Sequence, residues 1–99
     1  MLVLPIKKKW FDMIKSGEKK EEYREIKPYY ASRFEYFIMR QQLTKFKYGT
    51  ILFRNGYSSN SPTIECDVNI SIGYGKPEWG AEPNKLYYVL KILRVEKVE

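Results

Sequence analysis

The sequence contains no histidine and a single cysteine. Without histidine, the chain lacks the usual general base near neutral pH and the commonest metal ligand of proteins. Ser–His and Cys–His nucleophile pairs are therefore excluded, and a zinc site would need a ligand set made of carboxylates. We predict no metal site and no cofactor, and we expect any catalysis to use Lys, Glu, Asp, Tyr, Ser or Thr.

The chain also has no apolar run near the ~20 residues that a membrane-spanning helix needs. The opening MLVLPIKKKW has too short an apolar segment for a secretory signal, and its lysines follow that segment instead of preceding it. Cys66 has no partner for an internal disulfide, which fits a reducing compartment. These absences predict a soluble, cytoplasmic protein with no membrane partner.

Positive charge and tyrosine are abundant. Eighteen Lys and Arg residues face twelve Asp and Glu, a formal net charge of +6, and there are nine tyrosines. This combination favours a polyanionic partner and supplies rings on which bases can stack. The alternative is an ordinary basic surface over a core filled by tyrosines, and of the two we favour nucleic acid. A chain of 99 residues predicts one domain over residues 1–99, which we expect to be a monomer.

Two helices are predicted in the first half of the chain. Trp10, Met13 and Ile14 lie on one helical face, and Gly17 is placed to end that helix in a left-handed cap. A second helix is expected to begin near Pro28. One of its faces alternates aromatic and basic side chains, which fits a nucleic-acid backbone or, as we favour, ordinary surface pairs. These residues are Tyr29, Arg33, Tyr36 and Arg40.

Extended chain is predicted at residues 2–6, 50–55, 63–72 and 86–98. Strict alternation over residues 63–72 indicates a strand with one face in the core, so we interpret Cys66 as a buried packing residue. The order of elements, with non-local strand pairing, predicts an α+β fold: a small barrel or strongly bent mixed sheet of about five strands with two flanking helices. The apolar members of the alternation are Ile64, Cys66, Val68, Ile70 and Ile72.

The segment KSGEKKEEYREIK, residues 15–27, is dense in opposed charge. As a helix it would set like charges at i, i+4, and as a strand it is rich in poor strand formers. Strand alternation places Glu22 and Arg24 on one face, which Lys19 joins only if the chain turns just after Gly17. Such local conflict is expected of a segment that serves a site. The alternative is a solvated edge strand that is charged to prevent edge-to-edge pairing.

Residues 17–24 of this segment match the pattern G-x-K-x-x-E-x-R. The chain thereby resembles the ASCH domain, the activating-signal-cointegrator homology domain of PUA-like fold, and its FRNGY and GYGKPEWGAEP stretches are similar to those of small phage and bacterial members. The resemblance implies a β-barrel with a cleft that binds RNA or nucleotides. The matching residues Gly17, Lys19, Glu22 and Arg24 would face the ligand. Some members are enzymes: one branch deacylates N4-acylated cytidines, and another is linked to RNA cleavage.

The chemistry of these side chains is compatible with such a cleft. Lys19 and Arg24 can neutralise a phosphate or polarise a carbonyl, while Glu22 can accept hydrogen bonds from a base edge or act as a general base. Without a ligand, the three would form a charge network with one another. The chain departs from the deacylating branch at one position, because that branch uses a threonine nucleophile where this chain has Glu22. A variant mechanism would use Glu22 to activate water, with Lys19 and Arg24 stabilising the oxyanion.

The loops add further candidates. The deacylating branch uses a more distant glutamate, for which Glu78 and Glu82 are available here. Trp79 would be a stacking platform or would pack over the barrel mouth, and Arg54 and Tyr57 flank a tight-turn Asn-Gly dipeptide. We predict an RNA- or nucleoside-binding domain, with an amidohydrolase or ribonuclease as the first alternative and a non-enzymatic interaction protein as the second. The catalytic candidates are Lys19, Glu22 and Glu82, and the ligand-binding candidates are Gly17, Lys19, Glu22, Arg24, Arg54, Tyr57, Glu78 and Trp79.

Overall fold

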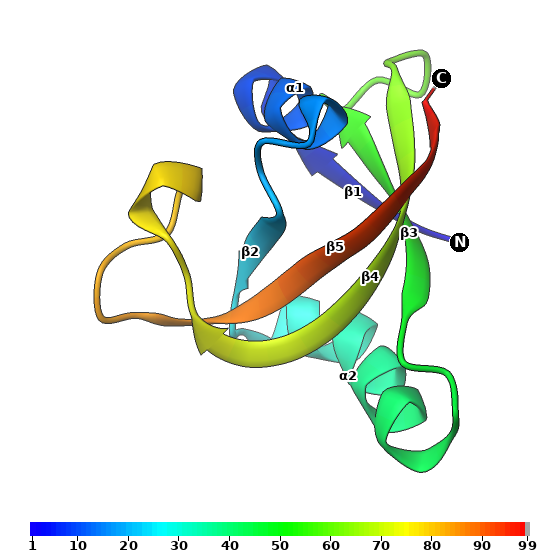
Figure 1. Cartoon of the computed structure of the whole chain (residues 1–99), viewed down its shortest axis with the longest axis vertical. Coiled ribbons are helices and arrows are strands. Elements are labelled where there is room, and N and C mark those ends of the chain that lie inside the picture. Colours follow the sequence, from blue (N-terminus) through cyan, green and yellow to red (C-terminus); the bar gives the residue numbers. More distant parts are fainter. Residues whose placement is uncertain (99) are drawn as a thin grey trace.

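The protein is an α+β domain with a strongly curled five-stranded mixed sheet and two helices, as the sequence predicted (Figure 1). This computed structural model describes residues 1–98. No helix within those residues has the length and apolar character to cross a membrane. The elements are β1 (Leu2–Ile6), α1 (Lys8–Ser16), β2 (Glu21–Glu25), α2 (Pro28–Leu43), β3 (Gly49–Asn55), β4 (Thr63–Tyr74), the short 3-10 helix η1 (Pro77–Trp79) and β5 (Leu86–Val98).

The strand order β1-β3-β4-β5-β2 places β1 and β2 at the two edges of the sheet. The β1–β3 pair is parallel, and the other three pairs are antiparallel. The sheet curls until its edges approach, and Arg24 of β2 donates a 2.8 Å hydrogen bond from Nη2 to the carbonyl oxygen of Pro5 in β1. Proline suits this edge because it has no N–H to leave unpaired. A side chain therefore joins the two edges where a barrel would have a backbone ladder.

Gly17 ends α1 in the left-handed conformation, with φ 86°, as predicted. Its N–H bonds to the carbonyl of Ile14, and the N–H of Lys19 bonds to the carbonyl of Met13 at 2.9 Å. A residue with a Cβ is disfavoured at this φ, so glycine permits the sharp turn. This is the turn that Lys19 needed in order to join the face of Glu22.

Helix α2 is fixed to β4 by the buried side chain of Gln41. Its amide nitrogen donates to the carbonyl of Ile70, and its amide oxygen accepts from the N–H of the same residue, both at 2.9 Å. The β3–β4 ladder ends at Val68, so the Ile70 backbone has no β3 partner. Gln41 satisfies both backbone groups in place of a strand.

The prediction for Ile72 was wrong, because this residue is 57% exposed although it continues the apolar alternation of β4. Beyond Val68, β4 pairs only with β5, and the strand runs past the part of the sheet that covers the core. The other predicted apolar members of this face are buried. Periodicity therefore identified the strand but not the point at which it leaves the core.

Cys66 is buried, as predicted, and burial raises the pKa of its thiol to about 12. It is therefore protonated at neutral pH and acts as a packing residue. Its neighbour Asp67 belongs to the polar half of the alternation and is nonetheless only 4% exposed. The β4–β5 register shifts beside it, between Asp67 and Val68.

Candidate functional site: a buried Lys-Glu-Arg network beside a cavity

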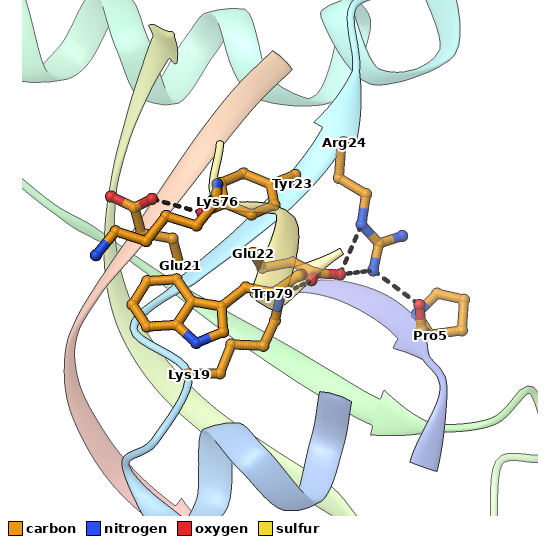
Figure 2. Close-up of polar contacts among 8 residues, drawn as sticks. All are labelled: Pro5, Lys19, Glu21, Glu22, Tyr23, Arg24, Lys76 and Trp79. Carbon is orange, nitrogen blue, oxygen red and sulfur yellow. Dashed lines mark hydrogen bonds and ion pairs between the residues drawn. The ribbon is translucent and has the colours of Figure 1, made fainter. Parts of the chain in front are cut away.

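Glu22 is the centre of a charge network at the start of β2. Its side chain is 9% exposed, and its two carboxylate oxygens bind two different cations. Oε1 lies 3.2 Å from Lys19 Nζ, while Oε2 lies 2.8 Å from Arg24 Nη2 and 3.2 Å from Arg24 Nε (Figure 2). One buried carboxylate thus serves two cations, so the three-residue cluster carries a net positive charge.

Lys19 has no exposed side-chain surface. Its ammonium donates to the carbonyl oxygen of Trp79 as well as to Glu22, and lies 4.7 Å from the ring centre of Trp10 and 5.1 Å from that of Tyr23. Burial lowers the pKa of Lys19, and the adjacent Glu22 carboxylate opposes that effect only in part. Two aromatic rings replace some of the lost hydration by cation–π attraction.

Arg24 extends the network to both sheet edges and to α2. Besides Glu22 and Pro5, it contacts the hydroxyl oxygen of Tyr30, to which Nη1 donates at 3.2 Å. Burial by itself would lower the pKa of Arg24, but the Glu22 carboxylate and the Tyr30 hydroxyl outweigh it and the pKa is raised. The guanidinium is therefore permanently charged and held in one orientation.

Tyr23 fixes the loop that follows β4. Its hydroxyl donates to Glu21 at 2.7 Å and accepts the backbone N–H of Lys76 at 2.9 Å (Figure 2). Burial raises the pKa of Tyr23 well above its ordinary value, so the hydroxyl stays protonated. A Cβ at Gly75 would lie 2.7 Å from the Tyr23 ring, so only glycine allows the loop to approach this closely. The loop in turn presents the Trp79 carbonyl to Lys19.

A cavity of about 640 Å³ opens beside this network. It is lined by Glu22 and Arg24, by aromatic rings and by lysines from several elements. The walls come from β1, the start of α1, β2, the start of α2, the end of β3 and the turn after it, the η1 loop and the start of β5, so they depend on the whole curled sheet. Among the lining aromatic residues are Trp10, Tyr23, Tyr30, Tyr57, Trp79 and Tyr87.

The structure separates the predicted site residues into groups. Glu22, Arg24, Tyr57, Trp79 and Glu82 line the cavity, whereas Glu78 does not. Tyr57 is 89% exposed at the cavity, and Glu82 pairs with Lys85 at 3.2 Å.

Three further candidates lie outside the cavity lining. Lys19 is buried behind Glu22, Gly17 forms the cap of α1, and Arg54 is half-buried on β3. Lys19 therefore acts on the cavity through the residues that it holds, Glu22 and Trp79.

Several lining residues were not named as site candidates from the sequence. Trp10 was assigned to a helix by its spacing, Tyr30 lies within the second predicted helix, and Lys27 belongs to the densely charged segment 15–27. Tyr87 and Lys85 belong to β5 and the loop before it, and Lys85 also lies 3.8 Å from Glu25 of β2. No local pattern marks these residues, because the pairing of β2 with β5 is what brings them to the cavity.

No cluster of carboxylate or thiol side chains suitable for a metal ion occurs in the part of the chain that the structure describes. Comparison with known proteins found no matching family model, curated protein or solved structure. The functional argument therefore depends on the geometry of the network and the cavity.

Proposed function

We propose that this chain is an ASCH-type domain that binds RNA or a nucleoside-type ligand in the cavity beside Glu22 and Arg24. The observation that carries the proposal is a 640 Å³ cavity that opens onto a carboxylate held by two cations. That volume lies within the roughly 300–1,000 Å³ of small-ligand sites, which combine apolar walls with a few placed polar groups. The net charge of +6 favours an anionic partner.

Each side chain has a distinct role in this proposal. Glu22 accepts hydrogen bonds from the exocyclic amino or imino groups of a base, because a fixed carboxylate is a strong acceptor. Trp79 offers a ring face for stacking. Lys19 is a positioning residue, since it contacts Glu22 and the Trp79 carbonyl and does not line the cavity.

Tryptophan fluorescence provides a direct test, because both tryptophans of the chain line the cavity. Titration with cytidine, uridine, adenosine, guanosine, N4-acetylcytidine and a short RNA is expected to give saturable quenching with at least one of them. Trp79→Ala should weaken binding by about 5- to 150-fold, the usual value of one base stack. Tyr74→Ala is the matched control, since Tyr74 is 68% exposed on β4 and lies outside the cavity lining. Absence of saturable quenching at millimolar ligand would refute the proposal and favour an interaction protein.

Hydrolysis of a modified nucleoside is the second candidate. It is favoured by the position of the Glu22 carboxylate, which faces the cavity with the Arg24 guanidinium 2.8 Å away. Glu22 would take a proton from water as it adds to an amide carbonyl, Arg24 would stabilise the oxyanion, and the amine would leave with the proton. Conversion of N4-acetylcytidine to cytidine and acetate is visible in the ultraviolet spectrum, and Glu22→Gln should abolish it. Saturable binding without conversion would leave the binding module as the function.

A further inference from the structure

A second cavity, of about 390 Å³, adjoins the first. The two share five lining residues, among them Arg24, Lys27, Tyr30 and Tyr57, so these side chains form the boundary between them. Tyr29, in the first turn of α2, lines only the second cavity. The two cavities therefore meet at the side chains of Arg24 and Lys27.

The two cavities differ in charge. Glu22, Glu25 and Glu82 line the first, whereas the described residues that line the second include no carboxylate. Among the described residues, the charged ones that line the second cavity are the two at the boundary, Arg24 and Lys27. The boundary is therefore positive, and carboxylate acceptors suited to a base edge line the first cavity.

Lys27 is free to meet an anion at this boundary. It is exposed and forms no ion pair within residues 1–98, and its ammonium lies 5.5 Å from the ring centre of Tyr30. Arg24 already donates hydrogen bonds to Glu22, Pro5 and Tyr30. Within residues 1–98, however, Nη1 keeps one N–H beyond the bond to Tyr30. Lys27 is thus the main cation available to a phosphate here.

Three tyrosine rings, together with Leu4 and Pro5, form the remaining wall of the second cavity. Tyr29 is 53% exposed and meets Tyr30 edge to face, with ring centres 5.0 Å apart. The guanidinium of Arg33 lies 3.5 Å from the ring centre of Tyr29 and stabilises the orientation of the ring. Exposed rings beside an unpaired lysine are the combination that binds successive bases and the phosphate between them.

We propose that the second cavity is a subsite for a nucleotide adjacent to the one bound in the first. The ligand is then a single-stranded oligonucleotide of at least two nucleotides, and the connecting phosphodiester lies against Lys27. This inference rests on the proposed function, since it takes the first cavity as a nucleoside site. Tyr29 and Tyr57 stack the second base, while Glu22 reads the first.

The test compares a nucleoside, its monophosphate and a dinucleotide by tryptophan quenching, with ribose and deoxyribose versions of each. The dinucleotide should bind about 5- to 150-fold more tightly than the nucleoside, the value of one added stack. Tyr29→Ala should remove that gain and leave nucleoside affinity unchanged, which also shows that the variant is folded. Tyr36→Ala is the matched control, an exposed tyrosine two turns further along α2 that lines neither cavity.

Lys27→Ala provides a second, independent measurement. It should lower the slope of log K against log salt by about 0.7 for the dinucleotide, as expected for one lost phosphate contact with a single strand. The slope of log K against log salt for nucleoside binding should be the same in Lys27→Ala as in the wild type. Lys45→Ala is the control, because Lys45 is exposed and outside both cavities.

The possible failures are distinguishable. If nucleosides bind and dinucleotides bind no more tightly, the second subsite is refuted and the proposed function stands. A dinucleotide gain that survives Tyr29→Ala also refutes the subsite. If neither kind of ligand quenches the fluorescence, both proposals fail. A stronger gain with the ribose dinucleotide would support the subsite with RNA as its ligand, and an equal gain would support it with single strands of either sugar.

Discussion

Two carboxylates of this protein form similar contacts in different surroundings. Glu22 and Asp67 each accept a 2.8 Å contact from an arginine Nη2, from Arg24 and Arg94 respectively. The Arg24 side chain is 11% exposed, whereas the Arg94 side chain is 59% exposed. Of the two carboxylates, Glu22 alone has a second, buried cation, Lys19, and lines one of the two cavities described above. The contact distance therefore does not determine how much each ion pair contributes to stability. The solvation of its cations does.

The Asp67 cluster lies on β4 and β5. Arg94 also pairs with Glu96 at 2.8 Å, and Thr50 donates to the second Asp67 oxygen at 3.0 Å. Burial would raise the pKa of Asp67, but hydrogen bonds from Arg94 and Thr50 outweigh burial and the pKa is lowered. If the Asp67–Arg94 pair is disrupted, water can hydrate the exposed Arg94 guanidinium in place of Asp67. At Glu22 the two cations have little access to water.

Of the substitutions in the two clusters, Glu22→Gln should destabilise the protein most. It leaves Lys19 and Arg24 buried without a countercharge, and we expect the free energy of unfolding to fall by about 3–5 kcal/mol. Urea denaturation followed by tryptophan fluorescence measures this change. Glu25→Gln, on the same strand and exposed, is the control and should stay within about 0.5 kcal/mol. A loss below 1 kcal/mol for Glu22→Gln would show that the buried and exposed clusters do not differ.

Lys19→Met should have a smaller effect than Glu22→Gln. Glu22 keeps Arg24 as a partner, and the main loss is an unsatisfied Trp79 carbonyl, worth about 1–3 kcal/mol. The same denaturation experiment ranks the two variants. If Lys19→Met is the more destabilising, Lys19 and not Glu22 is the centre of the network.

Asp67→Asn should change the acid dependence of stability. The folded pKa of Asp67 lies below the ordinary 3.8, so its contribution is complete above that pH and is lost as pH falls through 3.8 toward the folded value. We expect the variant to lose about 1.5 kcal/mol at pH 7, near the value of a hydrogen bond to a charged group. Its unfolding free energy should approach that of the wild type at low pH. Asp12→Asn, on the exposed side of α1, is the control, and an unchanged gap between wild type and Asp67→Asn from pH 7 to pH 2 would contradict the prediction.

Arg94→Ala should have the smallest effect, below that of Asp67→Asn, because water hydrates the exposed end of this pair. The loss should shrink further in high salt, where exposed pairs are screened. Thermal unfolding at two salt concentrations tests both statements. A loss comparable to that of Glu22→Gln would mean that exposure does not decide the strength of these pairs.

Much of the fold was predictable because its cues are local. Alternation identified β4 and its buried Cys66, helical spacing identified the inward face of α1, and Gly17 identified the end of that helix. One of the two interpretations of the charged stretch was a solvated edge strand. β2 is an edge strand, but Lys19 and Glu22 are buried, so the solvated part of that interpretation was wrong. The other interpretation, a segment that serves a site, remains a prediction, although Glu22 and Arg24 do line a cavity.

The exceptions share a physical origin. Ile72 is exposed and Asp67 is buried because of where β3 ends and where the β4–β5 register shifts. Neither the end of β3 nor the register shift can be predicted from the alternation of apolar and polar residues in β4. The same holds for the choice between Glu78 and Glu82, which differ by four residues and which only the path of the η1 loop separates.

The sequence by itself determined the order and type of the elements, because each depends on residues a few positions apart. It also brought Lys19, Glu22 and Arg24 within six positions of one another, so their network needed only the turn at Gly17. The tertiary structure decided that Lys19 lies behind the first cavity and that Arg24 joins the two sheet edges. It also decided that Tyr29 and Tyr57 both line the second cavity. Those outcomes follow from the curl of the sheet. The curl depends on the pairing of all five strands, so no single segment of the sequence predicts it.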